Sequence, residues 1–381
     1  MGDKRIAPVI AATEAYESWL RERLDAVEAD LQFKHRQMTA SLFAFLRGTF
    51  YRWAALFDET CPDLAKAPRL LAVGDLHVEN FGTWRDLEGR LVWGVNDLDE
   101  VATMPYAVDL VRTVTSAMIA KQERGLTIGE GVMASAVLEG YSQSLDAGGN
   151  AFVLEERHPA LREMATGADR DPVPFWSKLA KLPAANPPKR IKRLLERALP
   201  APAADIQFVS RIAGVGSLGR PRYVAFATCS GGLAAREVKA WLPSAWGWAR
   251  GRIKDRPYAT RLIERSPPPH DPYYSVRKEW VVRRLGPHCG RIELTQFPKK
   301  RDEREILKCM GRAAANMHLA SPDQCPKVLR DLSERKPDWL LEAADAMRNA
   351  TERDWQDFRA GARKHPEALL AVGGSRYASL E

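Results

Sequence analysis

The stretch LLAVGDLHVENFGTW, residues 70–84, places an acid, an imidazole, a second acid and an amide directly after an apolar run. The run Leu70–Val73 predicts a short buried strand. Asp75 and Asn80 are five residues apart across the turn that follows. A loop of this kind can direct both side chains into one cavity, Asp75 as a base and Asn80 as an oxygen ligand. We interpret His77 as a structural residue that fixes the loop through hydrogen bonds.

A second acidic cluster follows in RLVWGVNDLDE, residues 90–100. Here an apolar strand ends in the polar residues Asn96, Asp97, Asp99 and Glu100. Carboxylates at a strand end can present hard oxygen ligands to Mg²⁺ and leave room for substrate phosphates. For Asp99 and Glu100 taken alone, a helix cap or a turn is the simpler interpretation. The short spacing between the two clusters favours a shared site.

The composition is that of a globular protein and limits the classes of function. The 381 residues are 45% hydrophobic and 28% charged, and the length is enough for one large bilobal unit or two ordinary domains. The formal net charge of +8 suits anionic ligands such as nucleotides. Five scattered cysteines without CxxC spacing argue against a zinc site or a disulfide framework and favour a reducing compartment. The sequence lacks an apolar run long enough to span a membrane, so we expect a soluble cytoplasmic protein without a membrane partner.

Hydrophobic periodicity divides the chain into helical, β-rich and again helical parts. Helices are predicted at 13–47, 106–121, 127–145 and 187–198, around 258–265, and at 302–320, 327–346 and 351–363. Strands are predicted within 206–240 and at 277–285 and 291–296. This pattern predicts an α+β fold with a helical lobe over 1–200, a small antiparallel β lobe over 201–300 after the linker LPAPAAD, and helices over 301–381 that complete the helical lobe. The basic helix at 187–198 is interpreted as a solvated face, so a nucleic-acid partner is not expected.

A glycine-rich loop, GVGSLG at 214–219, connects two of the predicted strands. A dinucleotide-binding fold would need a helix directly after the loop, whereas Pro221 and an alternating strand follow it. A glycine turn between antiparallel strands is how kinases lay backbone N–H groups over nucleotide phosphates. Gly214, Gly216, Ser217 and Gly219 are therefore candidate nucleotide-binding residues. The alternative is an ordinary flexible hairpin turn.

The third predicted strand of this region ends in REVKAW and carries Lys239, twenty residues beyond Gly219. In a three-stranded sheet this lysine can reach phosphates held under the glycine loop. Glu264, on the short helix predicted next, could pair with Lys239 and hold it in place.

With these parts assembled, the sequence resembles the protein-kinase-like superfamily, and within it the aminoglycoside-phosphotransferase branch. GDLHVEN is similar to the HGDLHxxN catalytic loop of that branch, with Val73 in place of the leading histidine. More narrowly, five blocks in the expected order resemble the bacterial family named domain of unknown function 2252: FAFLRGTFYRW, GDLHVENFGTW, NDLDE, GVGSLG and VKAW. The sequence departs from the family pattern at Leu98, a position where the family usually has phenylalanine.

The order of the blocks differs from that of ordinary kinases, because the catalytic loop precedes the glycine loop. The segment ILKCMGRAAANMHLAS, residues 306–321, resembles the helix that normally comes before the catalytic loop. The resemblance therefore implies a circularly permuted, bilobal kinase-like fold.

The same resemblance implies a phosphotransferase that uses ATP and Mg²⁺ and acts on a hydroxyl acceptor, a small molecule rather than a protein. Asp75 would accept or orient the proton of the acceptor hydroxyl, Asn80 and Asp97 would hold Mg²⁺, and Asp99 is a possible second ligand. Lys239 and the glycine loop would bind the phosphates. Asp109 would cap its helix or brace the catalytic loop. A nucleotidyl transferase on the same fold and a non-catalytic nucleotide-binding pseudokinase are the alternatives.

Overall fold

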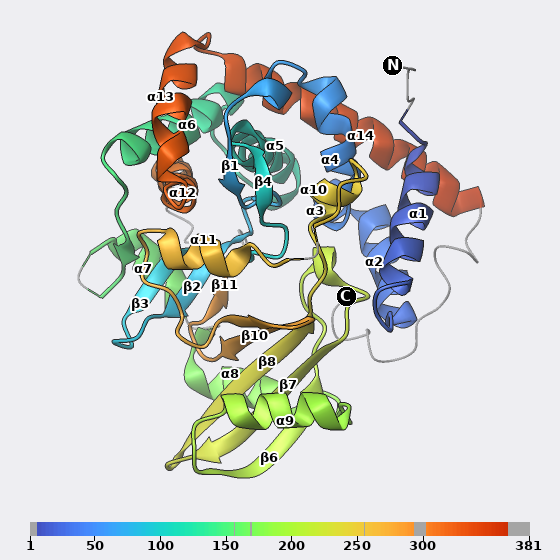
Figure 1. Ribbon diagram of the computed structural model, residues 1–381, viewed down its shortest axis with the longest axis vertical. Coiled ribbons are helices and arrows are strands. Elements are labelled where there is room, and N and C mark those ends of the chain that lie inside the picture. The colour runs from blue at the N-terminus through green and yellow to red at the C-terminus, as the bar shows by residue number, and fades with distance from the viewer. Residues whose placement is uncertain (1–5, 156, 168–169, 255, 293–301, 365–381) are drawn as a thin grey trace.

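The computed structural model describes residues 6–155, 157–167, 170–254, 256–292 and 302–364. It shows a mixed α+β protein in which a large helical lobe lies against a smaller β lobe (Figure 1). The helices of the helical lobe are α1 (Val9–Arg21), α2 (Glu28–Ala40), α3 (Leu42–Gly48), α4 (Phe50–Thr60), α5 (Ala107–Arg124), α6 (Glu130–Asp146), α12 (Glu303–His318), α13 (Cys325–Glu334) and α14 (Trp339–Lys364), together with the short α7 (Pro159–Ala165). No helix in these ranges is both long and apolar enough to cross a membrane.

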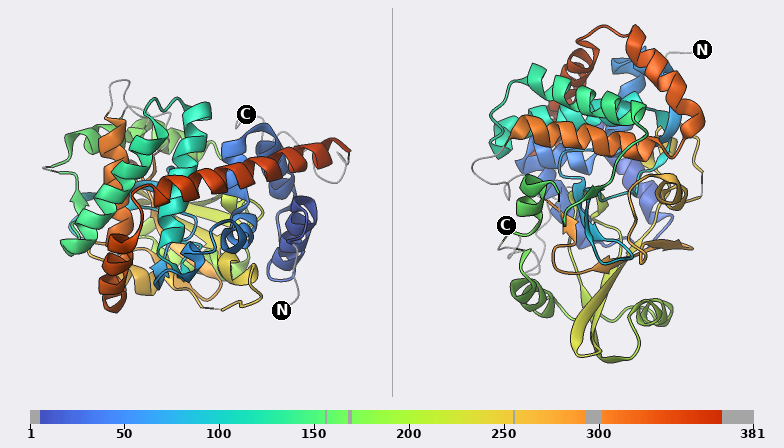
Figure 2. Two further views of the ribbon diagram at one scale, coloured as in Figure 1. Left: turned by 90° about the horizontal axis from the view of Figure 1, so that it is seen from above. Right: turned by 90° about the vertical axis from the view of Figure 1, so that its left-hand side faces the viewer.

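The core of the helical lobe surrounds α5, whose side chains from Val108 to Ala120 are almost all inaccessible to water. The long helix α14 packs along α5 and α4, and α12 packs along α6. Figure 2 shows α14 as one long helix running across much of this lobe. Burial of so much apolar surface is the main source of stability in a body of this size.

Two small antiparallel sheets lie inside the helical lobe and carry the polar loops. Strand β1 (Arg69–Ala72) pairs with β4 (Ala102–Pro105). Strand β3 (Leu91–Val95) lies between β2 (Phe81–Arg85) and β5 (Phe152–Val153), and β11 (Gly290–Arg291) adds to the other edge of β2. The strands predicted before each acidic cluster are therefore confirmed as β1 and β3.

The β lobe is one antiparallel sheet of five strands in the order β6-β7-β8-β10-β9. Its strands are β6 (Ala203–Ser210), β7 (Arg222–Cys229), β8 (Gly232–Ala240), β9 (Ser275–Arg277) and β10 (Trp280–Leu285). Helix α9 (Lys189–Ala198) covers one face through Ile191 and Leu195, and α8 (Pro172–Ala180) packs on the opposite face through Leu179. Both helices precede residue 201, where the sequence predicts the β lobe to begin.

Within residues 6–292 and 302–364, apart from the short gaps named above, the chain passes between the two lobes four times. It enters the β lobe at α8 and leaves it after β8. The short helices α10 (Ala245–Trp248) and α11 (Ala259–Arg265) then pack on the core of the helical lobe. The chain returns to the β lobe for β9 and β10, and β11 finally rejoins the helical lobe beside β2.

Most predicted elements match the structure, with three differences. The apolar pattern of 13–47 is divided among α1, α2 and α3, and the helices predicted at 327–346 and 351–363 are instead α13 and the long α14. The break falls at Arg335, where the backbone is extended just before Pro337. The strand predicted at 291–296 is present only as β11, which pairs with β2, and its residues 293–296 lie outside the described ranges.

Candidate functional site

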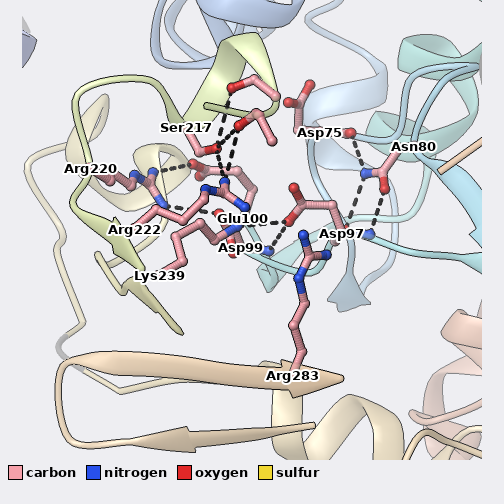
Figure 3. Close-up of polar contacts among 12 residues, drawn as sticks. Asp75, Asn80, Asp97, Asp99, Glu100, Ser217, Arg220, Arg222, Lys239 and Arg283 are labelled. Carbon is pink, nitrogen blue, oxygen red and sulfur yellow. Dashed lines mark hydrogen bonds and ion pairs between the residues drawn. The ribbon is translucent and has the colours of Figure 1, made fainter. Parts of the chain in front are cut away.

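A cavity of about 460 Å³ lies between the two lobes and is lined by both of the acidic loops and by the glycine loop. The predicted site residues on its wall are Asp75, Asn80, Asp97, Asp99, Gly214, Gly216 and Ser217. In Figure 3, Asp75, Asn80 and Asp97 lie on one side and Ser217 on the other. Segments more than 110 residues apart in the chain thus form one site, as the sequence interpretation requires.

The loop that carries Asp75 is braced by buried polar groups of its own lobe. The carboxylate of Asp109 on α5 accepts hydrogen bonds from the backbone N–H groups of Val73, at 2.8 Å, and Gly74, at 2.7 Å. Its Oδ2 also lies 2.9 Å from Nε2 of His318 on α12. Asp109 is therefore placed to brace the loop, one of the two roles expected for it, and this fixes the backbone before Asp75.

The Asp75 carboxylate faces the cavity and pairs with the fully buried Arg112. Nε and Nη2 of Arg112 both donate to Oδ1, at 3.0 and 2.7 Å. Burial raises the pKa of Asp75, and the charge and hydrogen bonds of Arg112 partly oppose that rise. Arg112 occupies Oδ1 and so orients the carboxylate.

Asn80 joins the two acidic loops through its side-chain amide. Its Nδ2 donates to the backbone oxygens of Asp75, at 2.8 Å, and Asp97, at 3.1 Å, and its Oδ1 accepts from the N–H of Asp97 at 2.7 Å. These bonds keep Asp75 and Asp97 side by side. Since a carbonyl oxygen has two lone pairs, Oδ1 retains one site for a further partner.

The second acidic loop is held by cations of the β lobe. Nζ of Lys239 on β8 pairs with the carboxylate of Asp99 and lies 3.7 Å from Oδ1 of Asp97. The Asp97 side chain is half exposed, whereas that of Asp99 is largely buried. Burial favours the neutral form of Asp97, but Lys239 and Arg283 outweigh it and hold the pKa of this carboxyl below its ordinary value. Asp97 thus remains an anion that faces the cavity.

Glu100 ends this loop in a more enclosed place. Its Oε2 accepts from the backbone N–H of Ala245 at 2.6 Å, and its Oε1 lies 3.4 Å from Nη2 of Arg220. Nη1 of Arg220 also donates to Asp99 at 3.1 Å. Burial raises the pKa of Glu100 to about 7 in spite of these favourable contacts.

The glycine loop packs on the helical lobe more closely than the sequence predicts. A Cβ at Gly216 would lie 2.9 Å from the backbone oxygen of Arg47 and 3.7 Å from Oδ2 of Asp75, and one at Gly219 would overlap Leu31 of α2 at 2.3 Å. Gly214 and Gly219 have φ of +73° and +93°, which disfavour any other residue. These glycines therefore also permit contact between lobes, beyond the approach to a nucleotide for which they were predicted.

Glu264 is not the partner of Lys239, which corrects the sequence interpretation. The Glu264 side chain is exposed on α11, and the carboxylates that pair with Lys239 are Asp97 and Asp99. Lys239 itself is buried behind these acids and is not on the cavity wall. The prediction failed because α11 packs on the helical lobe instead of beside β8.

His77 is buried on the cavity wall and serves the loop. Its Nδ1 accepts the N–H of Glu79 at 3.2 Å, and burial together with the nearby Arg47 lowers its pKa well below the ordinary value. A neutral imidazole that accepts a backbone hydrogen bond is in keeping with the structural role expected from the sequence.

A profile of the bacterial family described as "Uncharacterized protein conserved in bacteria (DUF2252)" matches residues 23–172 and 265–361. The chain belongs to this family. The matched ranges include both acidic loops and β10, while the glycine loop and Lys239 lie in the intervening 173–264. No curated protein and no solved structure matches the chain.

Sequence reasoning missed a cluster of arginines on the β-lobe wall. The carboxylate of Glu237, which is fully buried on β8, pairs with Arg211 at 2.8 Å, Arg222 at 2.7 Å and Arg283 at 2.7 Å. Burial alone would raise the pKa of Glu237, but the three guanidinium groups hold it well below its ordinary value. All three arginines line the cavity, and Figure 3 shows Arg283 extending from β10 toward Asp97.

A signal for this cluster was present in the sequence. Glu237 and Lys239 are two residues apart on one strand and therefore share a face of the sheet. Arg222 is the register partner of Lys239, and Arg283 is the partner of Glu237. Two of the arginines, Arg211 and Arg222, flank the glycine loop, a placement that indicates anion binding when read together with the loop.

The residues present fit a magnesium nucleotide in part. Asp97 presents a charged carboxylate to the cavity, and Asn80 keeps one free lone pair beside it. Asp99 fits less well as a ligand, because Lys239 and Arg220 already occupy it. In the described part of the chain, no group of three or more histidine, cysteine, aspartate or glutamate side chains is gathered as a metal site. Asp97 is thus the residue best placed to hold a cation.

The charge of the wall favours a polyanion. The three guanidinium groups around Glu237 carry three positive charges, and the Glu237 carboxylate neutralises one of them. This leaves an excess of positive charge next to Asp97. Planar guanidinium groups match the geometry of phosphate oxygens and bind them through paired hydrogen bonds. The volume is within the range of small-molecule sites.

Proposed function

We propose that this protein is a kinase-like phosphotransferase that uses ATP and Mg²⁺ and acts on the hydroxyl group of a small molecule. The observation that carries the proposal is the meeting of Asp75, Asp97 and the glycine loop around one cavity. Phosphoryl transfer needs a base or orienting group, charge neutralisation and backbone contact with phosphates, and it needs little covalent chemistry from the protein. These three components are supplied here by separate parts of the chain.

The proposed fold is a circularly permuted kinase-like one. It is supported by the position of α12, which ends close to the start of β1: the N–H of Leu71 donates to Oγ of Ser321 at 3.1 Å. The helix that would precede the catalytic loop in an ordinary kinase thus lies beside the strand that leads into it. Joining α12 to β1 would restore the usual order of the elements.

Each residue has a proposed role that follows from its contacts. Asp75, held by Arg112 through Oδ1, would accept or orient the acceptor proton through Oδ2. Asp97, with Asn80 beside it, would hold Mg²⁺, which neutralises phosphate charge when it is bound.

The cations of the β lobe would share the binding of the phosphates. The arginines around Glu237 lie on the cavity wall and would contact the nucleotide directly. Lys239 would act mainly by positioning Asp97 and Asp99, and it could reach a phosphate only if it left Asp99.

The proposed acceptor is small because the cavity between the lobes has a volume of about 460 Å³, which is the size of a small-molecule site. A cytoplasmic location is proposed from the cysteines, all five of which are free thiols.

Calorimetric titration with Mg·ATP tests the binding half of the proposal. We expect Asp97→Ala to weaken Mg·ATP binding or turnover by about a hundred-fold or more, as for removal of a main electrostatic contact in other enzymes. The matched control is Asp63→Ala: the Asp63 side chain is 92% exposed and forms an ion pair with the exposed Lys66. Absence of Mg·ATP binding to the unmodified protein would refute the proposal.

Incubation with ATP and a set of hydroxyl-bearing metabolites tests the transfer half. Product masses distinguish addition of a phosphoryl group from addition of a nucleoside monophosphate, the nucleotidyl-transferase alternative. Mg·ATP binding without transfer to any acceptor would favour the non-catalytic alternative.

A further inference from the structure

Lys34 is a buried lysine that the proposed mechanism does not use. It lies on α2 with 2% of its surface exposed and lines the inner part of the cavity, next to Tyr16 and Tyr51. The residues one turn before and after it support the glycine loop: Leu31 lies against Gly219, and Met38 belongs to the cluster that receives Val215. Residues three and four apart share a helix face, so Lys34 lies on the face that meets the glycine loop.

The Lys34 ammonium makes no hydrogen bond or ion pair with any residue that the structure describes. Its Nζ lies over the ring of Tyr51, 5.7 Å from the ring centroid. The closest carboxylate on α1, Glu17, is engaged by His35 at 2.6 Å. A polar group without a partner in such a place is costly, since burial removes the water that would otherwise solvate it.

The charge on Lys34 persists despite its burial. Burial lowers the pKa of Lys34 to about 8, so most of the ammonium groups are still protonated at pH 7. Charged and titratable groups surround Lys34 from several elements. They are Tyr16 and Glu17 from α1, Tyr51 from α4, Arg220 directly after the glycine loop, and Asp75 and Glu100 from the acidic loops. Arg220 is itself paired with Asp99 and Glu100. Among the residues that the structure describes, Arg220 is thus already engaged by carboxylates, whereas the Lys34 ammonium is available to meet a ligand in the cavity.

We propose that Lys34 binds a phosphate-class oxyanion in the inner part of the cavity, beside the glycine loop. The inference rests on the proposed function in its choice of anion, since phosphate is the group that a nucleotide or a phosphorylated acceptor would bring there. A lysine ammonium binds phosphate as a compact charge with three donors. Ligand binding would supply the partner that the ammonium lacks.

The test compares anion affinity with stability in three variants. Binding of inorganic pyrophosphate, without metal, and of Mg·ATP is measured by calorimetry for the unmodified protein, Lys34→Met and Lys34→Arg. We expect Lys34→Met to weaken pyrophosphate binding about ten- to a hundred-fold, the usual effect of losing a charged hydrogen bond, and Lys34→Arg to retain most of it. The matched control is Lys66→Met, whose side chain is 79% exposed.

Thermal unfolding of the same variants separates ligand binding from a structural role. Replacing an unpaired buried charge by an apolar side chain of similar length removes a desolvation cost, so Lys34→Met should melt at the same or a higher temperature than the unmodified protein. A lower melting temperature for Lys34→Met would show that the lysine is structural and would overturn the proposal. If Lys34→Met binds pyrophosphate and Mg·ATP as tightly as the unmodified protein does, the role of Lys34 is refuted as well. This holds even if the protein proves to use Mg·ATP.

The two ligands also identify the source of the anion. Equal losses for pyrophosphate and Mg·ATP in Lys34→Met would assign the subsite to the nucleotide phosphates. A loss for pyrophosphate alone would assign it to a phosphate of the acceptor. Pyrophosphate binding that depends on Lys34 would support the inference even without turnover of ATP, so the two proposals can fail separately.

Discussion

The Asp75 loop and the loop from Asp97 to Glu100 line the same cavity, but different parts of the molecule hold them in place. Asp109 and Arg112, both on α5, fix the Asp75 loop from within its own lobe. The backbone of the second loop is also tied to that lobe through Asn80, but its Asp99 side chain is held by Lys239 and Arg220, which come from the β lobe. The comparison indicates that the candidate base is preorganised by the helical core, whereas the acidic side chains of the second loop also depend on how the two lobes meet.

The largest effect is expected from Asp109→Ala, which removes the brace of the Asp75 loop. The substitution leaves the N–H groups of Val73 and Gly74 and the ring of His318 without their buried partner. We expect the free energy of unfolding to fall by about 4 kcal/mol. Denaturant titration measures this loss, and hydrogen exchange should show lost protection at Val73 and Gly74. Retained protection at these amides would contradict the brace, and Asp63→Ala should change stability by less than about 0.5 kcal/mol.

The next effect concerns the pH dependence contributed by Glu100. Its pKa is about 7 in the folded protein and near 4.5 in the unfolded chain, so the folded state holds an extra proton between these values. Stability from this group is present below pH 4.5 and is lost as the pH rises through 7. The free energy of unfolding of Glu100→Gln, measured relative to that of the unmodified protein, should therefore rise by about 3 kcal/mol between pH 4.5 and pH 8. A difference between the two proteins that does not change with pH would contradict the raised pKa.

A smaller effect is expected from Lys239→Met, which weakens the hold of the β lobe on the second loop. In this variant Asp99 still has its ion pair with Arg220, and the Asp97 side chain is half exposed to water. We therefore expect the free energy of unfolding to fall by about 2 kcal/mol at pH 7, less than for the loss of a fully buried pair. Because Lys239 holds the pKa of Asp97 down, this stabilisation is present above about pH 4 and is lost as the pH falls further. The carbon chemical shift of the Asp97 carboxyl should titrate at a higher pH in the variant. An unchanged midpoint would show that other cations, such as Arg283, suffice.

The local structure of both acidic loops could be predicted from the sequence because it depends on residues that are neighbours in the chain. An apolar run followed by a polar cluster predicts a buried strand with side chains at its end, and β1 and β3 have this form. The alternation and the turn residues around the glycine loop likewise predicted β6, β7 and β8. The convergence of these parts on one cavity followed from a resemblance, since no periodicity in the sequence could supply it.

The ion pairs escaped prediction for two reasons. Those of Lys239 and Arg220 with Asp99 depend on how the lobes pack, and those around Glu237 depend on the register of the β-lobe sheet. Arginines that alternate with apolar residues along a strand are typical of a solvated face, and only the position of the helical lobe turns Arg222 and Arg283 toward a cavity. Lys34 gives even less warning, since α2 mixes charged and apolar residues around its whole circumference. The pairing of Glu264 with Lys239 was wrong for the same reason, because α11 leaves the sheet for the other lobe.

The four passages of the chain between the lobes have a mechanical consequence. Each passage is a covalent tether, and β11 adds hydrogen bonds to β2 beside one of them. Two bodies joined at these four connections cannot separate widely without unfolding one of them. The glycine loop between β6 and β7 is not one of these connections: it meets the helical lobe by packing, Gly216 against Arg47 and Gly219 against Leu31, so it can shift without straining a tether.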